Sequence, residues 1–216
     1  MLITFEGIDG SGKSTQVQLL ESSLAARGRT VRRVREPGGA DLPERVRALL
    51  LDPALAIADR AELLLFSAAR AQLVDEVIRP ALASGETVIA DRFYDSTTAY
   101  QGGGRGLADA DWLDAFHRFV TGGLVPDRTY YIDVPLATAA ARRAGQQADR
   151  MEASGDAFYT RVRMAYLALA ARCPDRIFVL DGTLAPETIH SAIVADLDAL
   201  QSAQSGSLAE RGGTSS

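Results

Sequence analysis

The sequence of 216 residues has only one lysine, one cysteine and two histidines. Cys173 has no partner for an internal disulfide, and it precedes Pro174 at the end of a helical pattern, so we interpret it as buried filler rather than a reactive thiol. His117 and His190 are far apart in the sequence, which gives little support for a metal site or a histidine-based triad. The one lysine is the more informative residue.

Long apolar runs are also missing. No stretch approaches the ~20 apolar residues of a membrane span, and the start, MLITFEG, lacks the basic region and apolar segment of a secretory signal. The net charge of -5 disfavours a protein that binds nucleic acid or anionic membranes through a basic face. We therefore expect a cytoplasmic protein without nucleic-acid or membrane partners, in which any phosphate recognition is local.

What is present is a regular alternation of two kinds of segment. Short runs rich in β-branched or aromatic residues cover residues 2–6, 30–36, 87–91, 128–133 and 176–180, and Ala- and Leu-rich segments with helical spacing include 15–26, 60–83 and 158–171. Alternating strands and helices predict an α/β fold with a parallel sheet covered on both faces. Ligands of such sheets bind at the carboxyl ends of the strands.

Two segments depart from this alternation. Residues 145–155, GQQADRMEASG, interrupt the apolar periodicity between two helices, and we interpret them as a mobile excursion. From residue 202 the composition shifts to Ser, Gly, Gln and Thr, which predicts a frayed, disordered tail over 202–216. We expect one domain over residues 1–201.

The only lysine lies in a phosphate-loop pattern, Gly7-x-x-x-x-Gly12-Lys13-Ser14, directly between a predicted strand and a predicted helix. Glycines allow several backbone N–H groups to point inward, and the amino terminus of the helix adds positive potential. Lys13 is then expected to contact nucleotide phosphate, and the Ser14 hydroxyl can ligate Mg²⁺. The alternative is a glycine-rich turn with an exposed lysine.

This loop is shared by motors, switches and kinases. A GTP switch needs an Asn-Lys-x-Asp motif, which a chain whose only lysine is Lys13 cannot contain. A mechanical ATPase usually has glutamate after the aspartate that ends its third strand, whereas here Arg92 follows Asp91. An arginine at that position suits a second anionic substrate better than a hydrolytic water.

Other arginines follow the second predicted strand. Arg35 ends that strand, and Arg45 and Arg47 lie on the following segment. Each alone would be interpreted as a solvated surface residue. Because guanidinium groups bind phosphate in a bidentate manner, a cluster of them at strand ends favours a site for an acceptor phosphate facing the donor.

Two pairs at helical i, i+4 spacing add groups that can recognise a base. Phe66 and Arg70 are predicted to share one helix face, as are Thr97 and Gln101. An aromatic ring and an arginine donor opposite a hydroxyl and an amide can bind a flat base with carbonyl and imide edges. Taken singly, Phe66 would be interpreted as a core residue and Gln101 as a surface residue.

The sequence resembles the bacterial thymidylate kinases from Met1 to about Leu200. Five motifs carry the resemblance in order: FEGIDGSGKST, REPGG, LLLFSAAR, DRFYDSTTAYQGGGRG and DRME. The resemblance implies a three-layer P-loop nucleoside monophosphate kinase fold with a five-stranded parallel sheet. It also implies transfer of the γ-phosphoryl group of ATP to dTMP, giving ADP and dTDP for dTTP biosynthesis, in a Mg²⁺-dependent homodimer whose interface includes the helix around residues 60–83.

The resemblance also implies site residues. Those expected to bind ATP are Gly7, Ile8, Asp9, Gly10, Ser11, Gly12, Lys13, Ser14, Thr15 and Arg142, and Ser14 and Asp91 would hold Mg²⁺. Those expected to bind dTMP are Asp9, Arg35, Glu36, Pro37, Arg47, Phe66, Arg70, Arg92, Thr97, Tyr100 and Gln101. Within this set, Phe66 would stack on thymine, Asp9 would approach the 3′-hydroxyl, and Tyr100 would lie under the sugar.

Some members of this family place a catalytic arginine inside the phosphate loop, but residues 8–11 here contain no basic side chain. The missing charge is therefore expected from a lid segment at about residues 142–155, which offers Arg142, Arg143 and Arg150. The expected catalytic residues are Lys13, Arg92, Arg143 and Arg150, with the choice among the lid arginines open. Two alternatives stay open: a related nucleoside or nucleotide kinase, and a nucleotide-binding regulator without catalysis.

Overall fold

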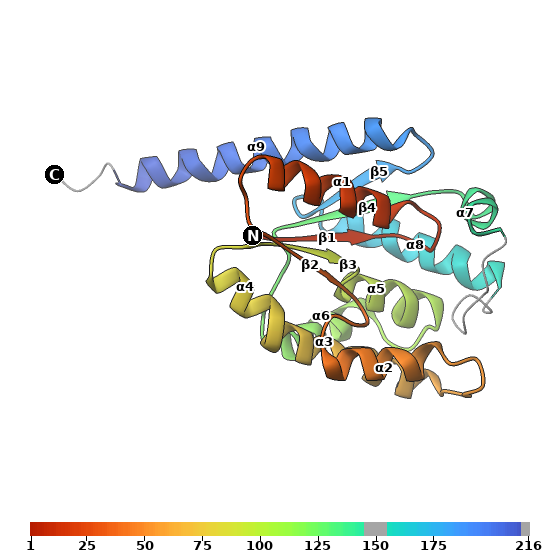
Figure 1. Ribbon diagram of the computed structural model, residues 1–216. Coiled ribbons are helices and arrows are strands. Elements are labelled where there is room, and N and C mark those ends of the chain that lie inside the picture. Colours follow the sequence, from red (N-terminus) through yellow and green to blue (C-terminus); the bar gives the residue numbers. More distant parts are fainter. Residues whose placement is uncertain (145–154, 213–216) are drawn as a thin grey trace.

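The structure is a computed structural model that describes residues 1–144 and 155–212, with only the backbone described for residues 203–212. Its centre is a sheet in the order β2-β3-β1-β4-β5, in which all neighbouring strands are parallel (Figure 1). The strands are β1 (Leu2–Glu6), β2 (Val31–Arg35), β3 (Thr87–Asp91), β4 (Arg128–Asp133) and β5 (Ile177–Asp181). The predicted five-stranded parallel sheet is confirmed, and each strand end lies within one residue of its prediction.

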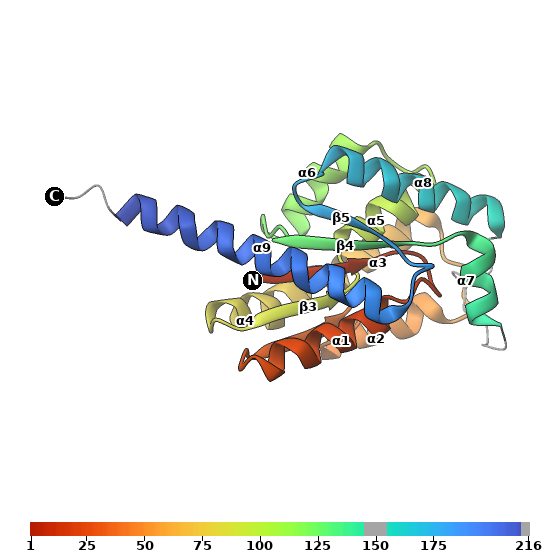
Figure 2. The same ribbon diagram turned by 90° about the horizontal axis from the view of Figure 1, so that it is seen from above.

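Helices cover both faces of this sheet. On one face, α1 (Lys13–Ala26) packs beside α9 (Pro186–Gly212), as Figures 1 and 2 both show. The opposite layer consists of α2 (Asp41–Leu51), α3 (Asp59–Leu73), η1 (Val74–Ile78), α4 (Arg79–Ala83), α5 (Tyr94–Thr97), η2 (Thr98–Gly104), α6 (Ala110–Val120) and α8 (Asp156–Arg172), in which η1 and η2 are π-helical. The short helix α7 (Leu136–Arg143) lies beyond the end of β4 (Figure 1). The three-layer arrangement expected from the sequence is confirmed.

Strand β1 lies in the middle of the sheet and is buried along its whole length. Ile3 and Phe5 pack with Leu20 of α1 and Ile193 of α9, whereas Leu2 belongs to the core on the opposite face with Ile78. Because both faces of the strand are covered, the run reads as nearly continuous apolar sequence. A charged residue at the end of this strand, Glu6, is therefore unusual.

The register of the sheet brings three strand ends together. Phe5 of β1 pairs with Asp91 of β3, and Asp91 also pairs with Arg35 at the end of β2. The loop after β1 therefore begins beside the residue that follows β3, which is Arg92. This edge is where a doubly wound sheet binds its ligands.

The interpretation of Cys173 needs correction. Cys173 is free and only half-buried at the end of α8, so it is less enclosed than filler of the core would be. His117 is buried, shares a hydrogen bond with Thr98 and stacks on Tyr94, which gives it a packing role.

In the part of the chain that the structure describes, no helix is long and apolar enough to cross a bilayer.

The chain after residue 201 differs from its prediction. Helix α9 continues to Gly212, whereas the composition predicts a frayed tail from residue 202. Ala, Gln, Leu, Glu and Arg all occur in residues 203–211 and have good helix propensity, and the Ser and Gly between them do not end the helix. Residues 213–216, and most of the excursion predicted at 145–155, including Arg150, lie outside the described residues.

Candidate active site

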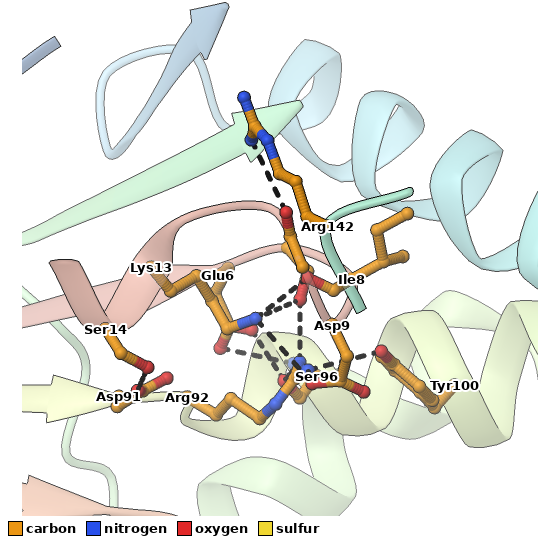
Figure 3. A network of polar contacts seen from close by, with 12 residues as sticks. Glu6, Ile8, Asp9, Lys13, Ser14, Asp91, Arg92, Ser96, Tyr100 and Arg142 are labelled. Carbon is orange, nitrogen blue, oxygen red and sulfur yellow. Dashed lines mark hydrogen bonds and ion pairs between the residues drawn. The ribbon is translucent and has the colours of Figure 1, made fainter. Parts of the chain in front are cut away.

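The loop between β1 and α1 closes around the ammonium group of Lys13. Its Nζ donates hydrogen bonds to the backbone oxygens of Gly7 at 2.8 Å and Ile8 at 3.0 Å (Figure 3). Gly7, Gly10 and Gly12 all have positive φ, which the tight turn requires. Lys13 is 6% exposed, so the alternative of an exposed lysine on a glycine-rich turn is wrong. Burial and the nearby charge of Arg92 lower the pKa of Lys13 to about 8.

A strongly polar cavity opens in front of this loop. Of the residues expected to bind ATP, it is lined by Asp9, Gly10, Gly12, Lys13, Ser14, Thr15 and Arg142. Gly7, Ile8 and Ser11 do not line it; their part is to shape the loop, since the Gly7 and Ile8 oxygens hold Lys13 and the Ser11 oxygen accepts from Arg142. We call this space the loop cavity.

Ser14 and Asp91 stand together at the mouth of the loop. The Ser14 hydroxyl donates to Asp91 Oδ2 at 2.9 Å, and both residues line the loop cavity (Figure 3). Within residues 1–144 and 155–212, no three His, Cys, Asp or Glu side chains gather to form a protein-only metal site. Mg²⁺ is often held by one or two protein oxygens together with substrate phosphates and water, and this pair of oxygen donors fits that requirement.

Arg92 follows β3 with φ 74, the one positive φ of a non-glycine residue in the described chain. Such a conformation costs roughly 1–3 kcal/mol and persists only where the surroundings enforce it. Its guanidinium donates to the Gly7 oxygen at 2.9 Å, to Asp9 at 2.7 Å and to the Tyr100 hydroxyl at 3.3 Å (Figure 3). Arg92 is therefore fixed against the phosphate loop.

Asp9 lies between two cations. Its Oδ1 accepts from Arg92 and is 4.0 Å from Lys13 Nζ. Burial raises the pKa of the Asp9 carboxyl, but the charges of Arg92 and Lys13 outweigh burial and hold this pKa well below its ordinary value. Asp9 is therefore a carboxylate at neutral pH and a hydrogen-bond acceptor only.

A second, less polar pocket lies on the far side of Asp9 and Arg92. Every residue expected to bind dTMP lines it except Arg35; they are Asp9, Glu36, Pro37, Arg47, Phe66, Arg70, Arg92, Thr97, Tyr100 and Gln101. Leu51 and Ser96 also line it and were not expected. We call this space the base pocket. Four of its residues, Asp9, Glu36, Arg47 and Arg92, line the loop cavity as well, so the two spaces adjoin.

Arg70 is almost fully enclosed at the end of the base pocket. Its Nε donates to Glu36 Oε2 at 2.7 Å, Nη1 donates to Thr97 Oγ1 at 2.9 Å, and Nη2 donates to the Phe93 oxygen at 3.2 Å. Burial raises the pKa of Glu36, although Arg70 pulls it down. The sequence pattern placed Arg70 correctly beside Phe66, but it did not predict that a buried carboxylate anchors it.

The remaining arginines separate into two groups. Arg35 and Arg47 line the loop cavity, where Arg35 is bound by both Glu44 oxygens at 3.0 Å and Arg47 donates to the Pro37 oxygen at 3.0 Å. Arg45 is exposed and lines neither space, so it does not belong to the predicted arginine cluster.

The described part of the lid also faces the loop cavity. Arg142 donates to the Ser11 oxygen at 3.2 Å and to the Gly182 oxygen at 2.8 Å, which ties α7 to the phosphate loop and to the end of β5. Arg143 lines the same cavity and lies over the Tyr159 ring at 5.7 Å.

Sequence reasoning missed Glu6, at the end of β1. Its carboxylate accepts from the Phe93 N–H at 2.8 Å, the Ser96 hydroxyl at 2.6 Å and the Tyr166 hydroxyl at 2.8 Å. Burial and the neighbouring charge of Asp95 raise the pKa of Glu6 to about 7. A charged residue at the end of a nearly apolar strand was the available signal, because a buried carboxylate needs partners.

Comparison with known proteins agrees with this geometry. A family model described as Thymidylate kinase matches residues 5–193, a range that contains both spaces. The chain belongs to the thymidylate kinase family. Membership confirms the resemblance stated from the motifs and identifies the protein as a kinase.

Curated and solved relatives support the same assignment. The thymidylate kinase of Chlorobium chlorochromatii (strain CaD3) is 48% identical over 213 residues, covering 92% of this chain and 94% of that protein. The thymidylate kinase of Chlorobaculum tepidum is 48% identical over 210 residues, covering 93% and 98%. The crystal structure of thymidylate kinase from Ehrlichia chaffeensis aligns with TM-score 0.75 and 37% identity over 92% of this chain and 98% of that chain.

Proposed function

We propose that the protein transfers the γ-phosphoryl group of ATP to dTMP, giving ADP and dTDP on the route to dTTP. The observation that carries the proposal is the shared wall between the loop cavity and the base pocket, made by Asp9, Glu36, Arg47 and Arg92. A nucleoside triphosphate held in the first space and a nucleoside monophosphate held in the second would meet at this wall with their phosphates facing each other. Such alignment is the main requirement of phosphoryl transfer.

ATP is assigned to the loop cavity. The inward backbone N–H groups, the amino terminus of α1 and the ammonium of Lys13 would bind its phosphates. Arg142 lies between the phosphate loop and Gly182, where it would contact the nucleoside part. A polyphosphate would also stabilise the charged form of Lys13, whose pKa burial has lowered to about 8.

The base pocket is assigned to dTMP. Phe66 would stack on thymine, Arg70, Thr97 and Gln101 would bind its polar edge, and Tyr100 would lie against the sugar. Arg92 and Arg47 line both spaces, so they would bind the monophosphate where it faces ATP. Arg35, which lines the loop cavity, and Glu36 and Pro37, which line the base pocket, would complete the surroundings of that phosphate.

Mg²⁺ would be held by Ser14 and Asp91 together with ATP. When bound, it would offset negative charge on the phosphates. The protein itself needs no general base, because the acceptor phosphate is already ionised at neutral pH. Lys13 and Arg92 would place positive charge where the transferred group passes, and Arg143 and Arg150 would add charge from the lid.

The protein is also proposed to act as a homodimer. Support comes from Leu64 of α3, which is 59% exposed, and Phe119 of the neighbouring helix α6, which is 85% exposed. Sedimentation of the purified protein tests this assembly. The cytoplasmic location expected from the sequence stays a prediction, which cell fractionation would test.

A coupled assay of ADP release tests the proposed reaction. With ATP and Mg²⁺ present, dTMP should stimulate ADP release far above the rate without an acceptor, and dTDP should form in equal amount. Parallel reactions with dUMP, dCMP, dAMP and dGMP define the base preference. A kinase for another base would respond to a different member of this panel, and a regulator without catalysis would bind ATP but show no acceptor-dependent ADP release.

A further inference from the structure

Glu62 is a buried carboxylate behind the base pocket to which the proposed reaction assigns no role. It lies on α3 one turn before Phe66, and its side chain is completely enclosed. Two of its partners come from η2 and the residue that caps it: Gln101 Nε2 donates to Glu62 Oε1 at 2.9 Å, and Arg105 contacts both carboxylate oxygens at 3.3 and 3.4 Å.

The contact with Glu62 determines which way the Gln101 amide points. A carboxylate can only accept hydrogen bonds, so the Gln101 side chain must turn its NH₂ group toward Glu62. The other end of the amide, Oε1, then points away from Glu62. Because Gln101 lines the base pocket, this oxygen is presented to that pocket. The reverse orientation would set Oε1 against the buried carboxylate, two acceptors without a proton between them, which is costly in an enclosed site.

Arg70 supplies the complementary group at the same end of the pocket. A guanidinium has five N–H donors, and four bonds engage Arg70: Nε and Nη2 with Glu36, Nη2 with the Phe93 oxygen, and Nη1 with Thr97. One N–H on Nη1 therefore has no acceptor among the described residues. The pocket thus offers a donor from Arg70 and an acceptor from Gln101.

We propose that Glu62 is a specificity-determining positioning residue, which fixes the Gln101 amide so that the base pocket accepts a pyrimidine with an imide N–H beside a carbonyl and rejects cytosine. The inference rests on the proposed function of this pocket. Thymine and uracil present a carbonyl acceptor at C4 and a donor at N3, which match Arg70 and Gln101. Cytosine presents a donor at C4 and an acceptor at N3, so both contacts would be mismatched.

The substitution Glu62→Gln tests this role with almost no change of shape. Arg105 donates to both carboxylate oxygens, so in either orientation the new amide sets its NH₂ group against one Arg105 donor, and residue 62 no longer accepts hydrogen bonds on both sides. Gln101 is then no longer held in one orientation and can also present its NH₂ group to the base. The variant should therefore lose part of the preference for dTMP over dCMP, because Arg70 still matches only the C4 carbonyl of thymine.

The measurement is kcat/KM for dTMP, dUMP and dCMP with wild-type protein and the variant. In Glu62→Gln, the ratio of dTMP to dCMP should fall by at least about 10-fold, the size of one exchanged hydrogen bond or more, whereas the ratio of dTMP to dUMP should not change. Glu76→Gln is the matched control, because Glu76 is an exposed glutamate that also accepts from a glutamine amide, Gln72 Nε2, at 2.9 Å. It should leave all three values unchanged.

A merely structural role for Glu62 would lower the three values together and leave their ratios intact, which would overturn the inference. If wild-type protein does not use dTMP at all, the proposed function fails instead, so the two failures are distinct. A second measurement covers a variant that does not fold: the imino proton of dTMP bound to wild-type protein should be protected from exchange with water in NMR spectra. Exchange as fast as in free dTMP would contradict an acceptor at Gln101.

Discussion

Three arginines of the site are held by carboxylates before any substrate binds. Arg92 is paired with Asp9, Arg70 with Glu36, and Arg35 with Glu44. Groups that are already oriented need not reorganise when charge develops on a phosphate, which is the main source of electrostatic catalysis. The sequence indicated Arg35 and Arg92 because they stand at strand ends, and Arg70 because it shares a helix face with Phe66. It did not indicate the carboxylate that holds each of them, because that pairing depends on the fold.

Lys13→Ala tests the residue that the sequence singled out first. The loop backbone is shaped by glycines and by α1, so the variant should fold, with an unchanged circular dichroism spectrum. The loop carbonyls hold the ammonium at 2.8 and 3.0 Å, where the proposed reaction uses its charge on the transferred phosphoryl group. Its loss should therefore lower kcat by roughly 10³-fold or more. A variant with near wild-type turnover would remove Lys13 from the mechanism.

Arg70→Ala should affect folding as well as binding. Arg70 is 2% exposed, and its removal would leave the Glu36 carboxylate buried without its cation. Breaking one side of a buried pair costs about 3–5 kcal/mol, which denaturant unfolding can measure. The double variant Arg70→Ala/Glu36→Ala should lose less stability than the sum of the two single variants. Additive losses would show that the pair is not coupled.

At the scale of elements, the site depends on how η2 packs against α8. The i, i+4 spacing predicted that Thr97 and Gln101 share a face, and both do line the base pocket. It did not predict the π-helical turns over 98–104, since these depend on tertiary packing rather than on periodicity. Gly103 permits the packing: a Cβ added there would lie 2.4 Å from the Ala165 Cβ of α8.

Gly103→Ala should therefore push α8 away from η2 and lower the free energy of unfolding by about 1–3 kcal/mol. Removing the opposing methyl group supplies the control. If the contact is responsible, Gly103→Ala/Ala165→Gly should be more stable than the sum of the two single effects indicates. Strictly additive effects would place the cost elsewhere, for example in the backbone of η2.

At the scale of the whole molecule, the fold class follows from patterns that the sequence shows plainly. Five β-branched runs alternate with helical segments, and a phosphate loop follows the first run, so the parallel sheet was predictable. The site beyond the loop was predictable only in part. Glu62 was missed because a buried carboxylate on a helix looks like any other charged residue in sequence. The roles of Glu62 and of Glu6, which ends an apolar strand, depend on donors brought close by the fold.

The buried Glu6 should make stability depend on pH. Burial and Asp95 raise its pKa from 4.5 to about 7, so between these values the folded protein binds more protons than the unfolded chain. By linkage, the contribution of Glu6 is fully present below pH 4.5 and is lost as pH rises through 7, by up to about 3 kcal/mol. As pH rises from 4.5 through 7, the unfolding free energy of the wild type should therefore fall relative to that of Glu6→Gln. A constant difference between the two proteins would show that Glu6 does not titrate there.

If the base pocket binds thymidine monophosphate beside the phosphate loop, calorimetric titration of the purified protein with dTMP should detect it. We expect saturable binding of one dTMP per chain with a Kd in about the micromolar range, weakened at least about 10-fold by Phe66→Ala. The assignment of dTMP to the base pocket would be contradicted if folded wild-type protein gave no binding heat with dTMP at about millimolar concentration.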